Sequence, residues 1–308
     1  MRRVIIDCDP GLDDAVALLA AFGAADIDVL AVTTVAGNVT GPQTALNAQI
    51  IREAAGLDSR VPIHAGAPRP MVRDPVTAED FHGTTGLGDI DFPAPRFDQS
   101  EAHAVEMIVR SCRSAKNAPI TMIVTGPMTN LALALDDSPD VVDGIAEIVL
   151  MGGADKEGGN ITPYAEFNVY ADPHAAATVF ESGIPIRCLS LDVTHFVRAT
   201  AERIKAVRGV ETTQAAIAGD LLQASSSLEF SAKGHRDAPL HDPSTIIAVT
   251  RPDLFKGRYA RVEVVTEPGQ HIGRTIPHFC EDGHVLWYEE ADDEGVFDEL
   301  CRLLGEYE

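Results

Sequence analysis

The segment RVIIDCDPGLDDAVALLAAFG, residues 3–23, decides the fold. It begins with a β-branched apolar run from Arg3 to Cys8 and continues as a helical pattern from Asp13 to Gly23. A short buried strand that leads directly into a helix is typical of the first unit of a parallel α/β sheet. We therefore expect the intervening residues to form a turn at the carboxyl end of the first strand.

The same alternation of strand and helix continues along the chain. We expect further strands at 27–35, 120–124, 146–151 and 184–189, with helical stretches such as 43–55 between them, then antiparallel strands at 261–265 and 285–288 and a final helix at about 292–304. This order predicts an α/β fold: a mostly parallel twisted sheet with helices on both faces, a Rossmann-like core and a small antiparallel C-terminal element. No internal repeat or low-complexity linker divides the chain, so we expect a single domain over 1–308.

Two segments interrupt this alternation. Residues 66–99 contain five prolines and the run HGTTGLGD, and residues 224–240 contain ASSSLEF and AKGHRDAPL. Long irregular connections in a compact domain are usually lids or binding loops. Ligands of such sheets bind at the carboxyl ends of the strands, so we expect both segments to border a site there.

The composition excludes several classes of protein. The 308 residues include 47 acidic and 24 basic side chains, a net charge of −23, which disfavours a nucleic acid partner. No apolar run approaches the roughly 20 residues that span a bilayer, so no membrane partner is expected. The N-terminus does not resemble a secretion signal, and five scattered cysteines without a CxxC pair suit reduced thiols in the cytoplasm.

The first turn carries an unusual concentration of carboxylates. Asp7, Asp9, Asp13 and Asp14 lie within eight residues, where they repel one another unless a cation lies among them. Ligands that are all oxygen suit calcium or magnesium rather than zinc. A single aspartate here could equally cap the helix, but the cluster predicts a metal site.

Five blocks of sequence resemble one known family. DCDPGLDDA (7–15), TGPMTN (125–130), LMGGA (150–154), AEFNVYADPHAA (165–176) and HDP (241–243) are similar, in this order, to the blocks of the inosine-uridine preferring nucleoside hydrolases. The resemblance spans about residues 4 to 250. It implies a cytoplasmic enzyme of purine or pyrimidine salvage, a homodimer or homotetramer, that hydrolyses the N-glycosidic bond of ribonucleosides to ribose and free base.

The resemblance also implies the catalytic residues. A calcium ion would be held by the carboxylates of Asp9, Asp14 and Asp242 and by the backbone carbonyl of Thr125. It would hold a water molecule and the 2′,3′-diol of the ribose, and Asp9 would be the general base for that water. His241 would protonate the leaving base, which a histidine can do near neutral pH.

The remaining candidate residues bind the substrate. By resemblance, Asp13 contacts the ribose hydroxyls, Asn160 and Glu166 face the 5′-hydroxyl, Asn168 faces the 2′ and 3′ side, Asn38 belongs to the ribose site and His82 lies near the base.

Asp172 and Asp242 each precede a proline as helix-capping residues do. We interpret Asp172 as structural only, and Asp242 as both cap and metal ligand.

The base site is the part of the sequence that departs from the family. Some members place tyrosines in the region matching residues 224–240, where this chain has Phe230 as its only aromatic residue. The choice between purine and pyrimidine is therefore open.

Two other functions compete with a nucleoside hydrolase. A haloacid-dehalogenase-like phosphatase also begins with Asp-x-Asp after a strand, but it requires a lysine, and none of the five lysines lies in a convincing motif. A non-catalytic nucleoside- or ribose-binding protein would not need Asp9, Asp14, Asp242 and His241 together. An assay of ribose release separates the three.

Overall fold

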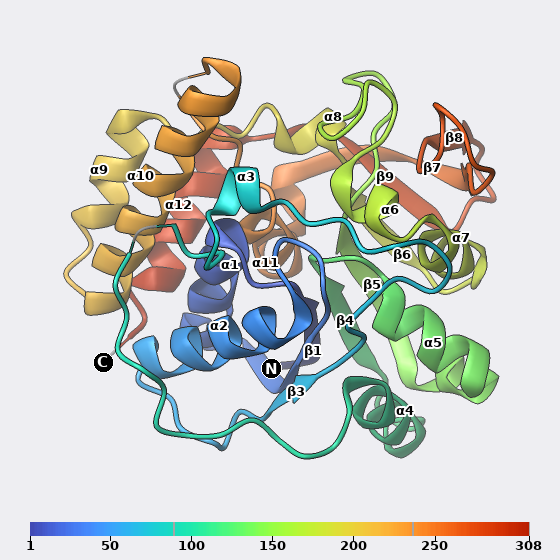
Figure 1. Cartoon of the computed structure of the whole chain (residues 1–308), viewed down its shortest axis with the longest axis horizontal. Coiled ribbons are helices and arrows are strands. Elements are labelled where there is room, and N and C mark those ends of the chain that lie inside the picture. The colour runs from blue at the N-terminus through green and yellow to red at the C-terminus, as the bar shows by residue number, and fades with distance from the viewer. Residues whose placement is uncertain (89, 236, 308) are drawn as a thin grey trace.

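The computed structural model describes residues 1–88, 90–235 and 237–307. Within these ranges the chain forms a nine-stranded sheet in the order β3-β2-β1-β4-β5-β6-β9-β7-β8 (Figure 1). The strands are β1 (Arg2–Cys8), β2 (Ile27–Thr34), β3 (Ile63–Ala65), β4 (Ile120–Val124), β5 (Ile145–Met151), β6 (Ile186–Leu189), β7 (Phe255–Val264), β8 (Thr275–Phe279) and β9 (Val285–Ala291).

Most of the neighbouring strands are parallel. All pairs from β3 to β6 are parallel, and β9 continues the same direction beside β6. Only β7 runs against its neighbours β9 and β8. The predicted α/β fold with an antiparallel C-terminal element is therefore confirmed. Two strands were not predicted from the sequence: β3, which has only three residues, and β8, which contains Pro277.

Helices cover both faces of the sheet. Side chains of β1 alternate between two hydrophobic clusters, with Val4 and Ile6 in one and Ile5 in the other, as the period of a strand requires. The first cluster includes side chains of α1 (Leu12–Gly23), α2 (Gly41–Ala54), α9 (Ala201–Arg208), α10 (Thr213–Lys233), α11 (Pro243–Thr250) and α12 (Asp293–Leu304). The second includes side chains of α4 (Ala104–Ser114), α5 (Thr129–Asp137) and α7 (Pro173–Glu181).

Short helical turns lie in the connections between these elements. They are α3 (Glu79–His82), α6 (Phe167–Ala171), α8 (Leu191–Thr194) and the two 3-10 turns Pro139–Gly144 and Pro252–Leu254. Among the described residues, no helix is both long and apolar enough to cross a membrane.

The strand order creates a switch point between β1 and β4. From β1 the chain proceeds to β2 and β3 on one side, then returns to place β4 on the other side of β1. Open α/β sheets bind ligands in the crevice that forms where the order reverses. Asp9 follows the carboxyl end of β1 and Thr125 follows that of β4, so both lie at this point.

The second predicted lid is mostly helix. Residues 224–233 continue α10, which ends at Gly234 with φ of +76°, a conformation that favours glycine as a helix cap. The run of small and polar residues before it contains neither glycine nor proline and does not break the helix. Residues 66–88 and 90–99, in contrast, are irregular apart from the short α3, which packs against α10.

Candidate active site

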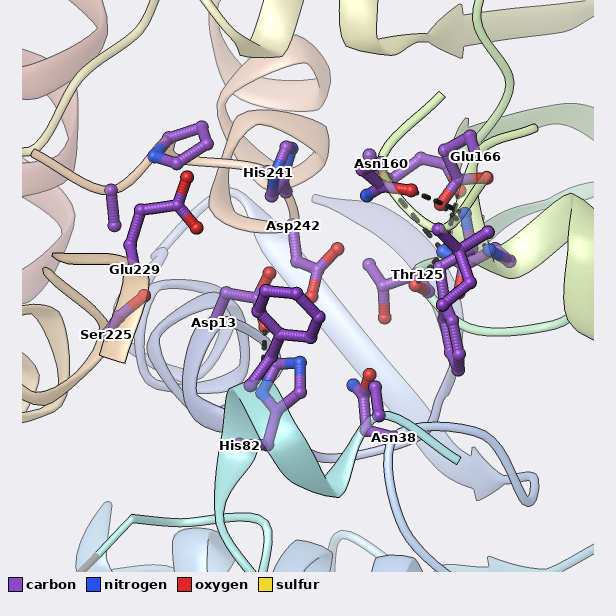
Figure 2. A pocket seen from close by; sticks show the side chains of 18 residues that line it. Asp13, Asn38, His82, Thr125, Asn160, Glu166, Ser225, Glu229, His241 and Asp242 are labelled. Atoms are coloured by element: carbon purple, nitrogen blue, oxygen red, sulfur yellow. Dashed lines mark hydrogen bonds and ion pairs between the residues drawn. The ribbon is translucent and has the colours of Figure 1, made fainter. Parts of the chain in front are cut away.

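A pocket of about 790 Å³, including its open mouth, lies at the carboxyl ends of the strands (Figure 2). All the predicted site residues except Asp9 and Asp14 line it. Those that do are Asp13, Asn38, His82, Thr125, Asn160, Glu166, Asn168, His241 and Asp242.

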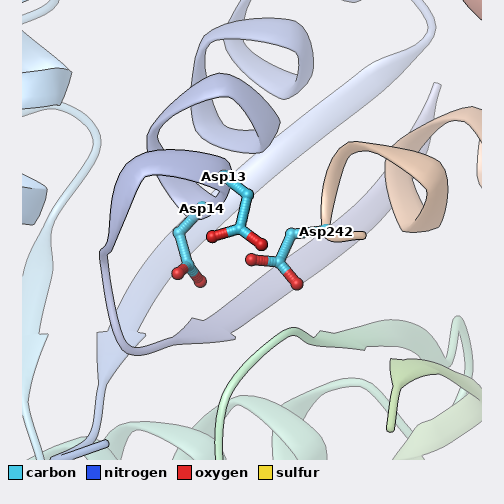
Figure 3. Close-up of side chains that lie close together, drawn as sticks. All are labelled: Asp13, Asp14 and Asp242. Atoms are coloured by element: carbon cyan, nitrogen blue, oxygen red, sulfur yellow. The ribbon is translucent and has the colours of Figure 1, made fainter. Parts of the chain in front are cut away.

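Three carboxylates meet beside this pocket. Asp13, Asp14 and Asp242 each offer an oxygen atom, and these atoms lie within 4.8 Å of one another (Figure 3). Burial, and then the charge of Asp13, raise the pKa of Asp14 to about 6. Burial and the neighbouring carboxylates raise the pKa of Asp242 well above its usual value. A divalent cation among them would relieve both the repulsion and the cost of burial.

Asp9 lies next to this trio but is not one of its three members. Its side chain is fully buried, and its Oδ2 accepts a hydrogen bond from the backbone N–H of Asn38 at 2.7 Å. The other oxygen, Oδ1, has no hydrogen-bond partner among the described residues. A Cβ at Gly126 would lie 2.5 Å from that oxygen, so only glycine leaves room for it. A buried acceptor without a partner is the kind of group that a cation or its water ligand would satisfy.

Asp14 is held by three hydrogen-bond donors. Its Oδ2 accepts from the backbone N–H of Gly11 and from Nδ2 of Asn38, both at 3.0 Å. Its Oδ1 accepts from the hydroxyl of Thr125 at 2.8 Å. We expected only the carbonyl of Thr125 to be used, and the structure corrects this: the hydroxyl orients Asp14. Asn38, expected at the ribose, also positions this carboxylate.

Glu166 is the central residue of the pocket wall that α6 and the loop before it form. This residue is the N-cap of α6, and its carboxylate accepts hydrogen bonds from the backbone N–H groups of Asn168 at 2.8 Å, Gly153 at 3.0 Å and Val169 at 3.2 Å. Burial raises the pKa of Glu166 to about 7 in spite of these bonds. Beside it, Oδ1 of Asn160 accepts from the backbone N–H of Phe167 at 2.9 Å. The wall is thus fixed before any ligand enters.

His241 lies between this wall and α10 (Figure 2). Its Nδ1 lies 2.8 Å from the hydroxyl of Thr194, and its ring centroid lies 5.7 Å from that of His195. The hydrogen bond at Nδ1 fixes the orientation of the ring. The next residue, Asp242, occupies the N-cap position of α11 but makes no side-chain cap hydrogen bond, so its predicted capping role is wrong.

Asp172 has the helix-capping contact that was predicted for it. It caps α7 by accepting from the backbone N–H of Ala175 at 3.1 Å, and its other oxygen accepts from the hydroxyl of Thr129 at 2.8 Å. It is fully buried and does not line the pocket.

His82 lies at the N-terminus of α1. Its Nδ1 accepts a hydrogen bond from the backbone N–H of Leu12 at 3.2 Å and lies 3.9 Å from Oδ1 of Asp13. Burial lowers the pKa of His82 to about 4, so the ring is neutral near pH 7. An Nδ1 that accepts a hydrogen bond places the ring proton on Nε2.

The roles of several residues in this region were not predicted from the sequence, and Asp7, a member of the expected carboxylate cluster, lies outside the trio. Asp7 is fully buried, and its Oδ1 accepts from the hydroxyl of Thr33 at 2.6 Å and from Nδ2 of Asn130 at 2.8 Å, which ties β1 to β2 and to α5. The signal for Asn130 was its place in the TGPMTN block. Ser225 and Glu229 line the pocket, whereas Phe230 is 52% exposed and does not.

Comparisons with known proteins agree with this geometry. The family model described as inosine-uridine preferring nucleoside hydrolase matches residues 4–298. The chain is 38% identical to an uncharacterized protein of Schizosaccharomyces pombe, over 98% of this chain and 99% of that one. It is 41% identical to the pyrimidine-specific ribonucleoside hydrolase RihA of Photobacterium profundum, over 89% of this chain and 88% of that one.

Solved structures share the fold along the whole chain. The purine-preferring ribonucleoside hydrolase from Gardnerella vaginalis superposes with a TM-score of 0.91 at 28% identity, over 99% of both chains. The chain belongs to the inosine-uridine preferring nucleoside hydrolase family. It is therefore an enzyme, an N-glycosidase that acts on ribonucleosides.

Proposed function

We propose that the enzyme hydrolyses ribonucleosides with the help of calcium, with Asp9 as general base and His241 as general acid. The observation that carries this proposal is the group of buried carboxylates beside a pocket whose other wall is rich in hydrogen-bonding groups. Calcium would be held by Asp9, Asp14, Asp242 and the Thr125 carbonyl. When bound, it would supply positive charge that lowers the pKa of a coordinated water and orients it.

The reaction breaks the bond between C1′ of the ribose and the ring nitrogen of the base. Positive charge develops on the ribose as that bond breaks, as in other glycoside hydrolysis. Asp9 accepts one proton of the water whose oxygen bonds to C1′. The bonding electron pair leaves with the base, and His241 supplies the proton that neutralises it.

Ribose recognition is assigned to the polar groups nearest the carboxylates. We propose that Asp13, Asn38 and Asn168 contact the 2′ and 3′ hydroxyls and that Asn160 and Glu166 contact the 5′-hydroxyl. Asn160, Glu166 and Asn168 are already held by backbone N–H and C=O groups, so little ordering of them is needed when the substrate binds. By resemblance to the family, we propose that His82 lies near the base.

We propose pyrimidine ribonucleosides as the preferred substrates. The relative at 41% identity carries the name pyrimidine-specific, whereas the purine-preferring structure is 28% identical. We also propose a homodimer or homotetramer in the cytoplasm, acting in nucleoside salvage, on the resemblance to the family. Sedimentation equilibrium of the purified protein tests the oligomeric state.

The decisive experiment measures ribose released from uridine, cytidine and inosine. We expect release with calcium present, loss after chelation and recovery when calcium is restored. Phosphate release from p-nitrophenyl phosphate is the control for the phosphatase alternative. Binding of uridine without release of ribose would instead support a non-catalytic binding protein.

A further inference from the structure

An irregular segment joins β5 to α6 and carries part of the proposed sugar site. Residues 152–166 contain neither helix nor strand, and they include Asn160 and Glu166, which line the pocket. Ordering so long a segment costs conformational entropy, so contacts with the rest of the molecule must fix its path. The segment lies beside α8 at the top of Figure 1. Its fixing contacts come from α8 and β8, whose residues do not line the pocket.

Asp192 of α8 holds three successive residues of this segment. Its Oδ1 accepts hydrogen bonds from the backbone N–H groups of Lys156 at 2.8 Å and Glu157 at 2.9 Å, and its Oδ2 accepts one from that of Asp155 at 3.1 Å. Oδ2 also accepts from Nε1 of Trp287 on β9 at 3.0 Å. These donors fill the roughly four lone-pair positions of a carboxylate, and hydrogen bonds to a charged acceptor are the stronger kind. Asp192 is buried, so water competes little for these bonds.

Thr275, the first residue of β8, holds the start of the same segment. Its buried hydroxyl accepts a hydrogen bond from the backbone N–H of Ala154 at 2.9 Å and donates one to the carbonyl of the same residue at 2.7 Å. The backbone N–H of Gly153, one residue earlier, donates to the carboxylate of Glu166 at 3.0 Å. The contact made by Thr275 is therefore one residue away from a direct contact with the proposed sugar site.

From these contacts, and resting on the proposed function, we propose that Asp192 and Thr275 are positioning residues for recognition of the 5′-hydroxyl of the ribose. They act through the turn at residues 153–157, which precedes Asn160 and donates a hydrogen bond to Glu166. Neither residue lines the pocket, so neither supplies a group to the reaction. Without either anchor the turn can shift, and a small displacement of a positioning group is costly because binding depends on geometry.

The test compares uridine with 5′-deoxyuridine, which lacks only the 5′-hydroxyl. We take the ratio of kcat/KM for the two substrates within each protein, because a variant that only folds less well loses the same factor on both. Thr275→Val keeps the shape of the side chain and removes both hydrogen bonds to Ala154. We expect it to lower the ratio by about 3- to 10-fold, the factor that one hydrogen bond typically contributes. Asp192→Asn replaces one acceptor by an amide donor that faces backbone N–H groups, and it should lower the ratio by a similar factor.

Two further variants are the controls. Thr275→Ser keeps the hydroxyl and should keep the wild-type ratio. Thr121→Val removes the hydroxyl of another buried strand threonine, on β4, whose hydrogen bond runs to Glu147 rather than to the turn, and it should also keep the ratio. The ratio of uridine to inosine should stay at the wild-type value in all four variants, because both substrates contain the same ribose.

An unchanged ratio of uridine to 5′-deoxyuridine in Thr275→Val and in Asp192→Asn would overturn the proposal, as would equal changes in Thr275→Val and Thr275→Ser. If one of the two test variants fails to fold, the other decides alone. If the wild-type enzyme does not prefer uridine over 5′-deoxyuridine, the proposed 5′-hydroxyl site and this proposal are both wrong. Failure of the wild-type enzyme to release ribose from any ribonucleoside would refute the proposed function itself, and that result is distinct because it precedes any variant.

Discussion

The side-chain amide of Asn168 donates a hydrogen bond to the backbone carbonyl of Thr125 at 2.7 Å. A second bond from the same Nδ2, to the carbonyl of Met151 at 3.1 Å, uses its other proton. The Oδ1 atom is then the part of this side chain that can accept a hydrogen bond from a ribose hydroxyl. Asn168 thus joins a proposed calcium ligand to the proposed sugar site.

Asn168→Ala should therefore affect both metal and sugar. We expect kcat/KM to fall by about 10- to 100-fold, and by the same factor for uridine, cytidine and inosine, because the ribose is common to them. Calcium affinity should also fall, since the Thr125 carbonyl loses the donor that holds it. Steady-state kinetics and calorimetric titration with calcium measure the two effects. Asn117→Ala, at an exposed position, is the control, and a change of base preference in Asn168→Ala would contradict the assignment.

Asp14→Ala should abolish calcium binding and activity together. Asp14 is fully buried, and hydrogen bonds from Gly11, Asn38 and Thr125 orient its oxygens beside the other two carboxylates of the trio. Its removal takes away one charged ligand and leaves three donors without their acceptor. Calorimetric titration with calcium measures the loss of metal binding, and the ribose assay measures the loss of activity. Asp26→Ala, an exposed substitution of the same charge, should bind calcium normally. Wild-type calcium affinity in Asp14→Ala would refute the proposed ligand set.

Much of this site could be predicted from sequence because three of the four proposed calcium ligands, Asp9, Asp14 and Thr125, follow β1 and β4, whose apolar runs are easily recognised. Asp9 lies in the turn after Cys8, and Asp13 and Asp14 lie in the first turn of α1, so the end of the first strand determines where all three carboxylates lie. The second role of Asn38, as a donor to Asp14, could not be predicted, since it depends on the distance between two turns in space.

The side of the pocket formed by α10 is harder to predict for a related reason. The run Ser225-Ser226-Ser227 has no strong helical period of its own, and its helical state depends on packing of α10 against α1 and α9. Only after that packing does Glu229 face the pocket while Phe230, its neighbour, faces solvent. A pattern of residue types does not contain this information.

The raised pKa of Glu166 predicts how the stability of the calcium-free protein depends on pH. Its folded pKa of about 7 lies above the ordinary value of 4.5, so the folded state binds the proton more tightly than the unfolded state. The resulting stability is complete below about pH 4.5 and is lost as the pH rises to about 7. A shift of this size corresponds to roughly 3 kcal/mol.

Urea unfolding of chelated protein at pH 5 and pH 8 tests this prediction. Other buried carboxylates contribute to the wild-type slope, so the informative quantity is the difference in slope between wild type and Glu166→Gln. We expect the variant to lose less free energy of unfolding than the wild type between the two pH values. Equal losses would show that Glu166 stays ionised when folded.

His241 is expected to act as the general acid. Its Nδ1 is oriented by the hydroxyl of Thr194, and it precedes Asp242 at the wall between the sugar groups and α10. General acid catalysis typically contributes about 10²- to 10⁴-fold, so His241→Ala should lower kcat/KM on inosine and uridine by that factor. p-Nitrophenyl riboside has a leaving group that departs without protonation, and its hydrolysis should be nearly unchanged.

The comparison of the two substrates separates proton donation from positioning. If His241 only held the ribose or oriented Asp242, the loss would be equal on inosine and on p-nitrophenyl riboside, because both share the sugar and the metal. His278→Ala, at an exposed histidine of β8, is the control and should leave both rates at wild-type values. If the two losses were equal, solvent would be the proton donor. His82 would not take this role, because its ring is neutral near pH 7 and its Nδ1 accepts a hydrogen bond from the backbone N–H of Leu12.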